Sequence, residues 1–422
     1  MLLSLEFNGY RFFNDSCLSF VADGRTKKLL SNSVELDGKN VLKSIGLYGS
    51  NNSGKTNITV LFNLLKMVLE GRERISFNNF IFDDPKKTSI SIIFNNMNNN
   101  GWLKYEFVYD NENMKYISEK LSKISYYESG NVLSNIIFEK NNENKLLKVF
   151  DEDKSKYLSI IPSRLPFLYS IELNSGDFSP LKEYLDELQT LANSIEIIKM
   201  YDIPYENTLE TMKNNNNNKI KFIKEFVRNA DIEINDFEYD SSITLKFQND
   251  IDEESLKRLE KNIDSYKLVT TYGNKKVPSI IFDSTGTKKI EAIASYIFDA
   301  LTEGKILVVD ELDNGLHYKL TRSIVSVFNN MLNTKSQLLF ATHDLLLIDC
   351  NTLMRKDQIY FVNRSKFGVN LYCLKESKAS NGGPREVSDI IKHYNRGEFG
   401  AVPNPSFINL IIEVLDNDNE EN

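Results

Sequence analysis

Hydrophobic residues in the first 125 positions are arranged mainly as in β-strands. Ser89 to Phe94 and Trp102 to Tyr109 alternate apolar and polar side chains, which is the pattern of a strand with one buried face. Ser44 to Tyr48 is a short apolar run followed by a glycine, and Asn57 to Glu70 carries apolar residues at the spacing of a helix. The pattern therefore predicts a strand, a glycine-containing loop and a helix in succession, beside a group of antiparallel strands.

The C-terminal third alternates short buried strands with helices. Ile306 to Val309 and Gln337 to Ala341 are apolar runs, whereas residues 290–301 and 320–332 have helical spacing. Short strands that are apolar on both faces and alternate with helices are typical of a parallel sheet. We therefore expect an α/β fold in this part of the chain.

The middle of the chain has a different pattern of hydrophobic and charged residues, mainly with helical spacing. Leu181 to Ile198 has the spacing of a helix, and Asp252 to Asp264 is a charged, helix-like stretch. We interpret this region as an inserted, mainly helical arm. The expected division of the chain is an N-terminal part, 1–150, the arm, 151–264, and a C-terminal part, 265–422.

The net charge of the chain limits the nucleic-acid contacts that it can make. The 422 residues include 51 Lys and Arg against 59 Asp and Glu, so the formal charge is 51 − 59 = −8, and a protein that wraps nucleic acid over its whole surface would need the opposite balance. Nucleic-acid binding would then require a local basic patch.

The three cysteines are far apart and form no CxxC pair, which excludes a disulfide scaffold and suits a reducing cytoplasm. No apolar run approaches the ~18 residues of a membrane span, so we predict a soluble, cytoplasmic protein.

The strongest chemical signal lies between the predicted strand and helix. Gly49 to Thr56 reads Gly-Ser-Asn-Asn-Ser-Gly-Lys-Thr, a complete GxxxxGK[ST] motif. Its backbone N–H groups and the helix N-terminus can cradle phosphates, Lys55 can reach the β and γ oxygens, and Thr56 offers a hydroxyl to Mg²⁺. A simple glycine-rich turn is the plain alternative, but the flanking elements argue against it. The expected nucleotide-binding residues are Gly49, Ser50, Asn51, Asn52, Ser53, Gly54, Lys55, Thr56 and Asn57.

A second signal is the pair of carboxylates that ends the strand beginning at Ile306. Asp310 and Glu311 would lie at the carboxyl edge of the sheet, where ligands bind in such folds. We expect Asp310 to hold Mg²⁺ and Glu311 to act as general base on the attacking water. A solvated strand edge is the alternative, and the nearby phosphate-binding motif makes the catalytic interpretation stronger.

The next apolar strand ends in Thr-His-Asp. His343 at that edge could reach a γ-phosphate and sense its loss. A surface histidine is the ordinary alternative, and a metal site built on His343 and Asp344 is a third. The chain has only three histidines, the others being His317 and His393, which is too few for a multi-histidine metal site.

A weaker signal precedes the helix predicted near Ile290. Ser284, Gly286 and Thr287 could make a second anion-binding helix N-terminus. The alternative is an N-cap serine followed by a turn glycine.

These four elements resemble, in order and spacing, Walker A, signature, Walker B and switch histidine of the ABC-type ATPases in the SMC, RecF and OLD group. Asp310 to His317 resembles the DELDxxLH element of the bacterial AAA15/AAA21 ATPases, which include RloA- and AbiL-type abortive-infection proteins. Arg355 to Val362 and Tyr394 to Pro403 are similar to the tail of that family. The likeness covers roughly residues 1–125 and 265–405.

The chain departs from the wider ABC pattern at several points. Its signature lacks paired glycines, His317 stands where a D-loop aspartate is usual, and no Q-loop glutamine can be assigned. OLD and Gabija proteins carry a TOPRIM nuclease after the ATPase, whereas no such domain is expected after position 405 here. The effector would then be a separate polypeptide.

The resemblance implies a P-loop NTPase fold: an ABC-type ATPase head with a mixed or parallel sheet, an antiparallel β lobe and the inserted arm. It implies ATP and Mg²⁺ as cofactors, Lys55, Glu311 and His343 as catalytic residues, and a homodimer or higher oligomer with ATP between the heads. The leading hypothesis is an ATP-hydrolysing switch in antiphage defence that controls a separately encoded nuclease or toxin. The alternatives are a RecF-like DNA-repair protein and a non-hydrolysing scaffold, and Glu311 argues against the latter because a scaffold needs no general base.

Overall fold

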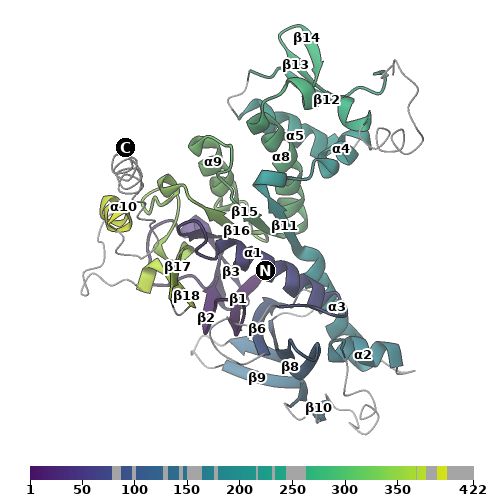
Figure 1. Cartoon of the computed structure of the whole chain (residues 1–422), viewed down its shortest axis with the longest axis vertical. Coiled ribbons are helices and arrows are strands. Elements are labelled where there is room, and N and C mark those ends of the chain that lie inside the picture. The colour runs from purple at the N-terminus through teal and green to yellow at the C-terminus, as the bar shows by residue number, and fades with distance from the viewer. Residues whose placement is uncertain are drawn as a thin grey trace, which may run out of the picture.

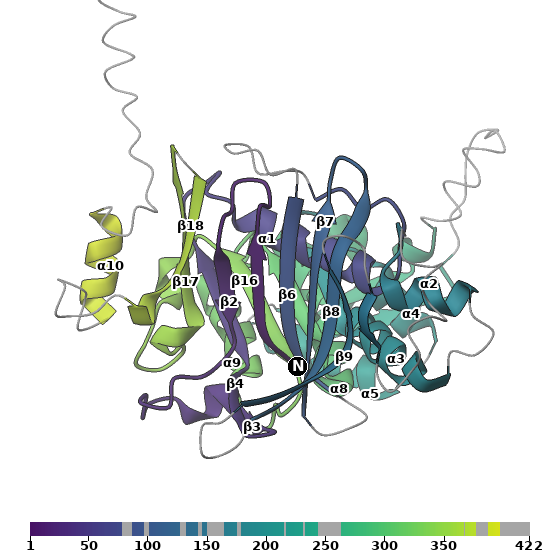
Figure 2. The same cartoon turned by 90° about the horizontal axis from the view of Figure 1, so that it is seen from below.

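A computed structural model describes residues 1–77, 87–96, 101–126, 132–141, 146–149, 164–174, 179–214, 217–230, 233–243, 263–366, 368–376 and 387–396. Two large sheets dominate it. The first, called sheet A here, is antiparallel throughout and has the strand order β10-β9-β8-β7-β6-β1-β2. Figure 2 shows most of these strands side by side. Their bounds are β1 (Leu2–Asn8), β2 (Ser16–Ser19), β6 (Lys87–Asn95), β7 (Trp102–Asp110), β8 (Lys115–Tyr126), β9 (Val132–Lys140) and β10 (Leu146–Val149).

The second sheet, sheet B, has the order β11-β15-β16-β5-β17-β18 and is parallel except for the last pair. Every residue of β5, β15 and β16 is buried, as expected for strands covered on both faces. This confirms the predicted α/β class with an antiparallel lobe. The bounds are β5 (Ser44–Tyr48), β11 (Ile195–Lys199), β15 (Ile306–Asp310), β16 (Gln337–Thr342), β17 (Ile359–Ser365) and β18 (Gly368–Cys373).

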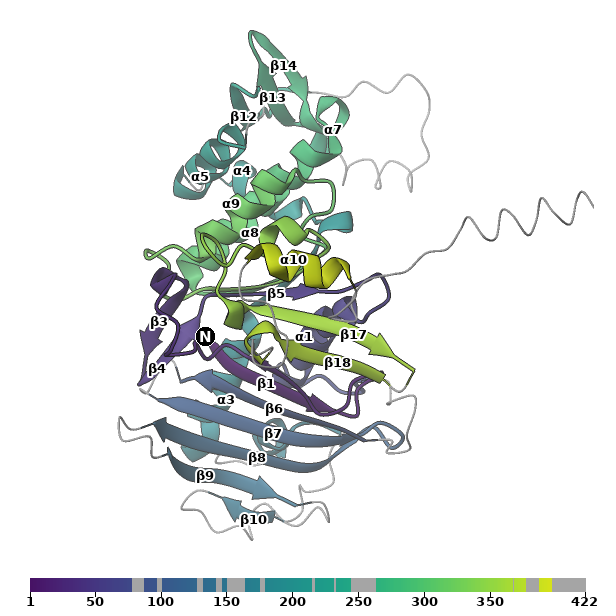
Figure 3. The ribbon, with the colours of Figure 1, turned by 90° about the vertical axis from the view of Figure 1, so that its left-hand side faces the viewer.

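Helices separate and cover the two sheets. α1 (Lys55–Leu69) and α3 (Ser179–Ser194) share one hydrophobic core with the inner face of sheet A and one face of sheet B, so α1 lies between the sheets (Figure 3). The other face of sheet B packs against α8 (Thr285–Glu303), α9 (Tyr318–Phe328) and α10 (Val387–Asn395). α1 is therefore held between the facing sides of the two sheets.

A smaller unit packs along α8 (Figure 1). Its three-stranded antiparallel sheet and two of its helices form a separate hydrophobic cluster that includes Ile290 and Ala294 of α8. Its elements are α4 (Glu206–Lys213), α5 (Asn217–Arg228), β12 (Asp236–Tyr239), β13 (Leu268–Tyr272), β14 (Lys275–Pro278) and α7 (Ser279–Phe282). Also present are α2 (Phe167–Asn174) beside α3 and the hairpin β3 (Ser33–Leu36) and β4 (Lys39–Leu42).

Two predicted helices end earlier than their hydrophobic spacing indicated. The helix predicted from Leu181 to Ile198 ends at Ser194, and the next residues form β11, since Ile195, Ile197 and Ile198 pair with β15 in sheet B. The helix predicted for 320–332 ends at Phe328. β-Branched side chains in short runs fit a helix or a buried strand equally well by spacing alone. The pairing partner decides, and it lies more than 100 positions away.

The division of the chain at 150 and 264 stays a prediction. The structure adds that β11, inside the interval 151–264, is a strand of sheet B, and that the sheet β12-β13-β14 extends across position 264. Residues 252–262 of the charged stretch and positions 397–403 of the tail motif lie outside the described residues. Within the described ranges, no helix is both long enough and apolar enough to span a membrane.

Candidate functional site

The loop between β5 and α1 has the geometry that its two glycines require. A Cβ atom on Gly49 would lie 2.4 Å from the carbonyl oxygen of Val362 and 2.6 Å from Ser53 Oγ, so no side chain fits there. Gly54 has φ of +116°, which L side chains rarely adopt, and the Phe13 ring lies 3.1 Å from the position of its Cβ. Contacts with Val362, Ser53 and Phe13 therefore restrict the conformation of the loop.

Lys55 is the first residue of α1 and is only 6% exposed. Its Nζ donates hydrogen bonds to the carbonyl oxygens of Gly49 at 2.7 Å and Ser50 at 3.0 Å. Burial lowers the pKa of Lys55 to about 8, and the nearby carboxylates, Asp310 first, oppose this shift. The ammonium group is thus held inside the loop by neutral acceptors and can exchange them for phosphate oxygens.

A hollow of about 280 Å³ opens at the N-terminus of α1. It brings together residues of three segments that the sequence analysis selected separately: the glycine-rich loop, the end of β15 and the end of β16. The lining residues are Asn51, Asn52, Ser53, Gly54, Lys55, Thr56, Asn57, Asp310, Glu311 and His343. The parallel register of β15, β16 and β5 accounts for this convergence, because the carboxyl ends of the three strands meet at one edge.

Asp310 carries the features of a metal ligand. It is 1% exposed, and neither carboxylate oxygen accepts a hydrogen bond from another described residue. Burial raises the pKa of Asp310, whereas the Thr56 side chain beside it opposes the shift. A buried carboxylate without a donor needs a partner, and a carboxylate beside a threonine hydroxyl suits Mg²⁺.

Few protein oxygens surround this position. Within the described part of the chain, no group of three or more His, Cys, Asp and Glu side chains could hold a metal ion by itself. Mg²⁺ commonly keeps several waters and binds one or two protein oxygens together with substrate phosphates. Thr56 and Asp310 therefore fit Mg²⁺ bound together with a nucleotide.

Glu311 has an unusual backbone conformation. Its φ is +54°, in the left-handed region that costs a non-glycine residue about 1–3 kcal/mol. Its Oε2 accepts a hydrogen bond from Asn314 Nδ2 at 2.8 Å, and its carbonyl oxygen accepts one from the Asn314 amide at 2.8 Å. Glu311 lines the hollow together with Asp310.

Asp313 was not selected from the sequence, although it lies inside the Asp-Glu-Leu-Asp segment. Its Oδ1 accepts hydrogen bonds from Thr342 Oγ1 at 2.8 Å and from the His343 backbone N–H at 3.2 Å. Partial burial and the charge of Lys55 lower the pKa of His343, and the nearby carboxylates, Asp313 first, oppose this shift. Asp313 thus joins the loop after β15 to the histidine at the end of β16.

Lys199 is a second residue that sequence reasoning missed. It ends β11 and is the direct pairing partner of Asp310 on the neighbouring parallel strand. Burial raises the pKa of Asp310, and the positive charge of Lys199 is among the contributions that oppose this shift. No sequence signal identified Lys199, because its strand was interpreted as the end of a helix.

The predicted signature residues lie outside this hollow. Ser284 is the N-cap of α8, and its Oγ accepts a hydrogen bond from the Thr287 amide at 3.1 Å. A Cβ on Gly286 would lie 2.9 Å from the Gly315 carbonyl oxygen, so this glycine allows α8 to approach the loop that follows β15. The helix-cap alternative therefore describes the local geometry, and a role for Ser284, Gly286 and Thr287 in nucleotide binding stays a prediction.

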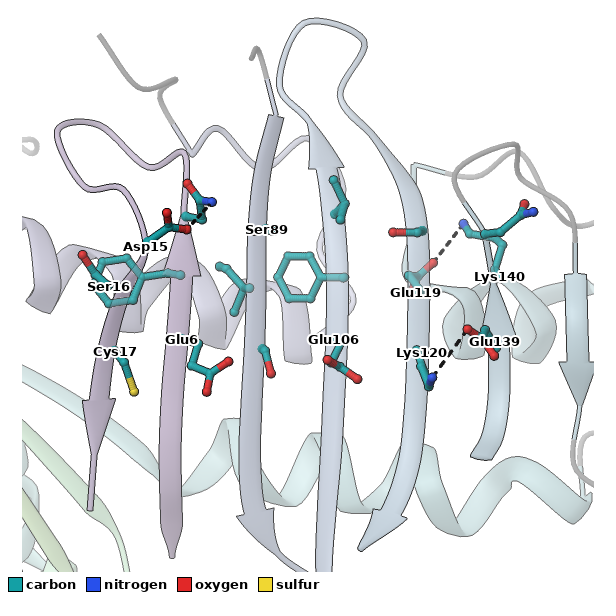
Figure 4. A pocket seen from close by; sticks show the side chains of 18 residues that line it. Glu6, Asp15, Ser16, Cys17, Ser89, Glu106, Glu119, Lys120, Glu139 and Lys140 are labelled. Atoms are coloured by element: carbon teal, nitrogen blue, oxygen red, sulfur yellow. Dashed lines mark hydrogen bonds and ion pairs between the residues drawn. The ribbon is translucent and has the colours of Figure 1, made fainter. Parts of the chain in front are cut away.

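A larger hollow of about 710 Å³ lies on the outer face of sheet A (Figure 4). A row of paired residues crosses it from β1 to β9: Glu6, Ser91, Glu106, Lys120 and Glu139. Several of its charges are paired, as in Lys120–Glu139 at 3.5 Å and the buried pair Lys140–Glu119 at 3.0 Å. Its lining contains neither a glycine-rich loop nor a helix N-terminus, so we place the phosphate-binding site at the smaller hollow.

Comparisons with known proteins identify the family of the chain. The sequence model of the family described as "AAA domain, putative AbiEii toxin, Type IV TA system" matches residues 44–349, an interval that contains β5, α1, β15 and β16. No curated protein sequence matches the chain.

Several solved structures are similar to parts of the chain at low sequence identity. An SMC head bound to the C-terminal winged-helix domain of ScpA is 14% identical, covers 88% of this chain and 97% of its own, and has a TM-score of 0.42. The SMC head domain from Thermotoga maritima is 11% identical, with 88% and 98% coverage and a TM-score of 0.40. The recombination mediator protein RecF is 15% identical, with 88% and 98% coverage and a TM-score of 0.36.

Proposed function

The chain belongs to the AAA-domain family described as putative AbiEii toxin of a type IV toxin–antitoxin system, and on this basis we propose that it binds and hydrolyses ATP as a switch subunit in bacterial antiphage defence. One observation carries the ATPase proposal. The hollow at the N-terminus of α1 unites the glycine-rich loop and Lys55 with two carboxylates, Asp310 and Glu311, and with His343.

Each group in this hollow has a definite task in the proposed reaction. The backbone N–H groups of the loop and the start of α1 bind the phosphates, and Lys55 exchanges its two backbone acceptors for the β and γ oxygens. Thr56 and Asp310 would hold Mg²⁺, which would neutralise phosphate charge. Glu311 accepts the proton of the attacking water, and His343 contacts the γ-phosphate.

We further propose that two chains share each nucleotide. Ser284, Gly286 and Thr287 lie at the N-terminus of the 19-residue helix α8, outside the hollow of their own chain. A helix N-terminus attracts phosphate, so this end of α8 in a second chain would complete the site. The assembly would be a homodimer, or a higher oligomer, that closes around ATP and opens after hydrolysis.

The antiphage role is proposed from the resemblance of Asp310 to His317 to the corresponding element of abortive-infection ATPases, and the family description, putative AbiEii toxin of a type IV toxin–antitoxin system, is compatible with it. We propose that the chain controls a separately encoded effector, such as a nuclease of the TOPRIM type. The net charge of −8 favours a protein partner over extensive nucleic-acid contact.

Hydrolysis by the purified chain tests the ATPase proposal. We expect Mg²⁺-dependent release of phosphate from ATP by the wild type. Glu311→Gln should bind ATP with Mg²⁺ about as tightly but lose roughly 100-fold or more of the turnover, since only proton acceptance is removed. Lys55→Ala should instead weaken ATP binding. A Glu311→Gln variant that turns over ATP like the wild type would overturn the assignment of the general base.

Phage infection of cells that carry the gene and its neighbours tests the defence proposal separately. We expect protection with the wild type and none with Glu311→Gln, and we expect no cleavage of DNA by the purified chain alone. Cleavage that disappears when one of this chain's own carboxylates is replaced would contradict the two-protein arrangement.

A further inference from the structure

A buried lysine of α8 contacts the loop that carries Glu311. Lys289 is 7% exposed, and burial lowers its pKa, while the charge of Glu311 opposes this shift. Its Nζ donates to the backbone carbonyl oxygen of Asn314 at 2.9 Å and to Asn314 Oδ1. Lysine is almost never this buried without a partner, and here both hydrogen-bond acceptors belong to one asparagine.

This contact fixes the orientation of the Asn314 amide. Lysine only donates hydrogen bonds, so the side-chain oxygen of Asn314 must face Lys289. The amide nitrogen then faces Glu311, and Nδ2 donates to Oε2 of that carboxylate at 2.8 Å. The opposite amide orientation would place N–H groups against the ammonium group and an oxygen against the carboxylate.

The backbone of the loop 311–315 adopts conformations that need support from neighbouring residues. Glu311 has φ of +54°, a conformation that persists in a non-glycine residue only when its surroundings hold it. Gly315 has φ of +71°, and a Cβ there would lie 3.0 Å from Lys289 Nζ. Gly286, three residues before Lys289 in α8, lies against the Gly315 carbonyl oxygen. The first turns of α8 therefore contact Asn314 and Gly315 directly.

We propose that Asn314 is the positioning residue for Glu311 and that Lys289 acts through it, so that α8 aims the general base of its own chain. The proposal rests on the proposed ATPase function, in which Glu311 accepts the proton of water. One carboxylate oxygen of Glu311 is held by Asn314, which leaves the other for the water. Because Ser284 caps the N-terminus of α8, the same helix that would face the second nucleotide also holds the base of the first site.

The test is a set of steady-state measurements on the full-length protein. Asn314→Ala should lower kcat by about 10-fold to 100-fold while KM and the Kd for ATP change less than twofold, since a base displaced by about 1 Å loses roughly this much rate. Lys289→Met should lower kcat by about tenfold, and Lys289→Arg, which keeps donors at that position, should recover most of the activity. Lys43→Met is the matched control with wild-type kcat, because Lys43 is a buried lysine at the amino end of β5 and its Nζ donates to the Asn330 carbonyl oxygen at 2.9 Å, away from Glu311.

Non-additivity separates positioning from general damage. In the Glu311→Gln background, Asn314→Ala should produce no further loss of the residual turnover. Should Asn314→Ala fail to fold, Asn314→Asp keeps the volume and replaces the donor facing Glu311 with an acceptor, and it should give the same loss of kcat.

The outcomes distinguish the two levels of the proposal. A wild type without ATP hydrolysis contradicts the proposed function. A wild type that hydrolyses ATP and is inactivated by Glu311→Gln, with folded Asn314 variants at wild-type kcat or with equal losses in kcat and ATP affinity, overturns the positioning role alone. Multiplicative losses when Asn314→Ala is added to Glu311→Gln overturn it as well.

Discussion

Lys55 occupies an environment in which a positive charge is unfavourable until phosphate arrives. It is buried against backbone carbonyl oxygens, and its pKa is lowered to about 8. Bound phosphate would stabilise the charged form and raise this pKa. The free protein therefore has to take up a proton to bind ATP at alkaline pH, while near neutrality the ammonium group is already charged.

We accordingly predict that ATP affinity depends on pH. Affinity should be nearly constant from pH 6 to 7 and fall above pH 8, approaching tenfold per pH unit, because the neutral amine no longer attracts phosphate. Calorimetric titration with a non-hydrolysable ATP analogue measures this, and Lys55→Met provides the control, with weak binding that is flat across the same range. Wild-type affinity that is unchanged or stronger at pH 9 than at pH 7 would contradict this account of Lys55.

The contacts between residues far apart in the sequence were the part of the site that the sequence did not predict. Lys55, Asp310 and Glu311 belong to local motifs whose chemistry can be read from neighbouring positions. Asp313 becomes informative only when Thr342 and His343 lie beside it, and Lys289 only when it reaches Asn314. These contacts join positions about 25 to 30 residues apart, so no local pattern could reveal them.

At the scale of elements, the site depends on how a strand, a loop and a helix follow one another. β5 ends at Tyr48 and α1 begins at Lys55, and the intervening loop is pressed against β17 at Gly49. A methyl group at Gly49 would overlap the Val362 carbonyl oxygen and Ser53 Oγ. The loop would have to shift, and its N–H groups would no longer converge on one phosphate.

Gly49→Ala should therefore lower the free energy of unfolding by about 1–3 kcal/mol, the usual cost of overpacking, and abolish detectable ATP binding. Gly24→Ala is the matched control, because a Cβ at Gly24 meets nothing within 4 Å. Denaturant unfolding and ATP titration of both variants provide the comparison. Equal stability and equal ATP affinity in the two variants would show that the loop tolerates a side chain at position 49.

The sequence predicted a helix or strand correctly where its hydrophobic pattern fitted only one type of secondary structure. Ser44 to Tyr48 is the strand β5 as expected, and the apolar runs at 306 and 337 begin β15 and β16. β11 was taken for helix because Ile195 to Ile198 continue the helical spacing of α3. Whether Ile195 to Ile198 form a helix or a strand depends on their pairing with β15, and the local sequence does not reveal that pairing.

At the scale of the whole molecule, two buried sheets fix α1 between them, and α8 connects the smaller unit to sheet B. α8 thus contacts the Glu311 loop along one side and carries Ser284 at its exposed N-terminal end. This arrangement suits an assembly in which the helix of one chain meets the nucleotide of another. The family resemblance suggested a shared site, whereas the position of α8 relative to residues 311–315 required the structure.

The central claim is that Lys55, Asp310 and Glu311 of one chain and Ser284 of another make a single hydrolytic site. Lys55→Ala and Ser284→Arg should each be inactive as pure proteins. In a mixed dimer one site carries both changes and the other is intact. With random pairing, about half the dimers are mixed and each has one working site of two, so roughly a quarter of wild-type activity should return if sites act independently.

The most direct measurement is thus the ATPase rate of an equimolar mixture of these two variants after subunit exchange. We predict that activity returns in the mixture, at about a quarter of the wild-type rate, although each variant alone is inactive. Ser284→Arg that hydrolyses ATP at the wild-type rate would show that the site is complete within one chain and that Ser284 only caps α8. An inactive mixture of two variants that have verifiably exchanged subunits would contradict the shared site as well.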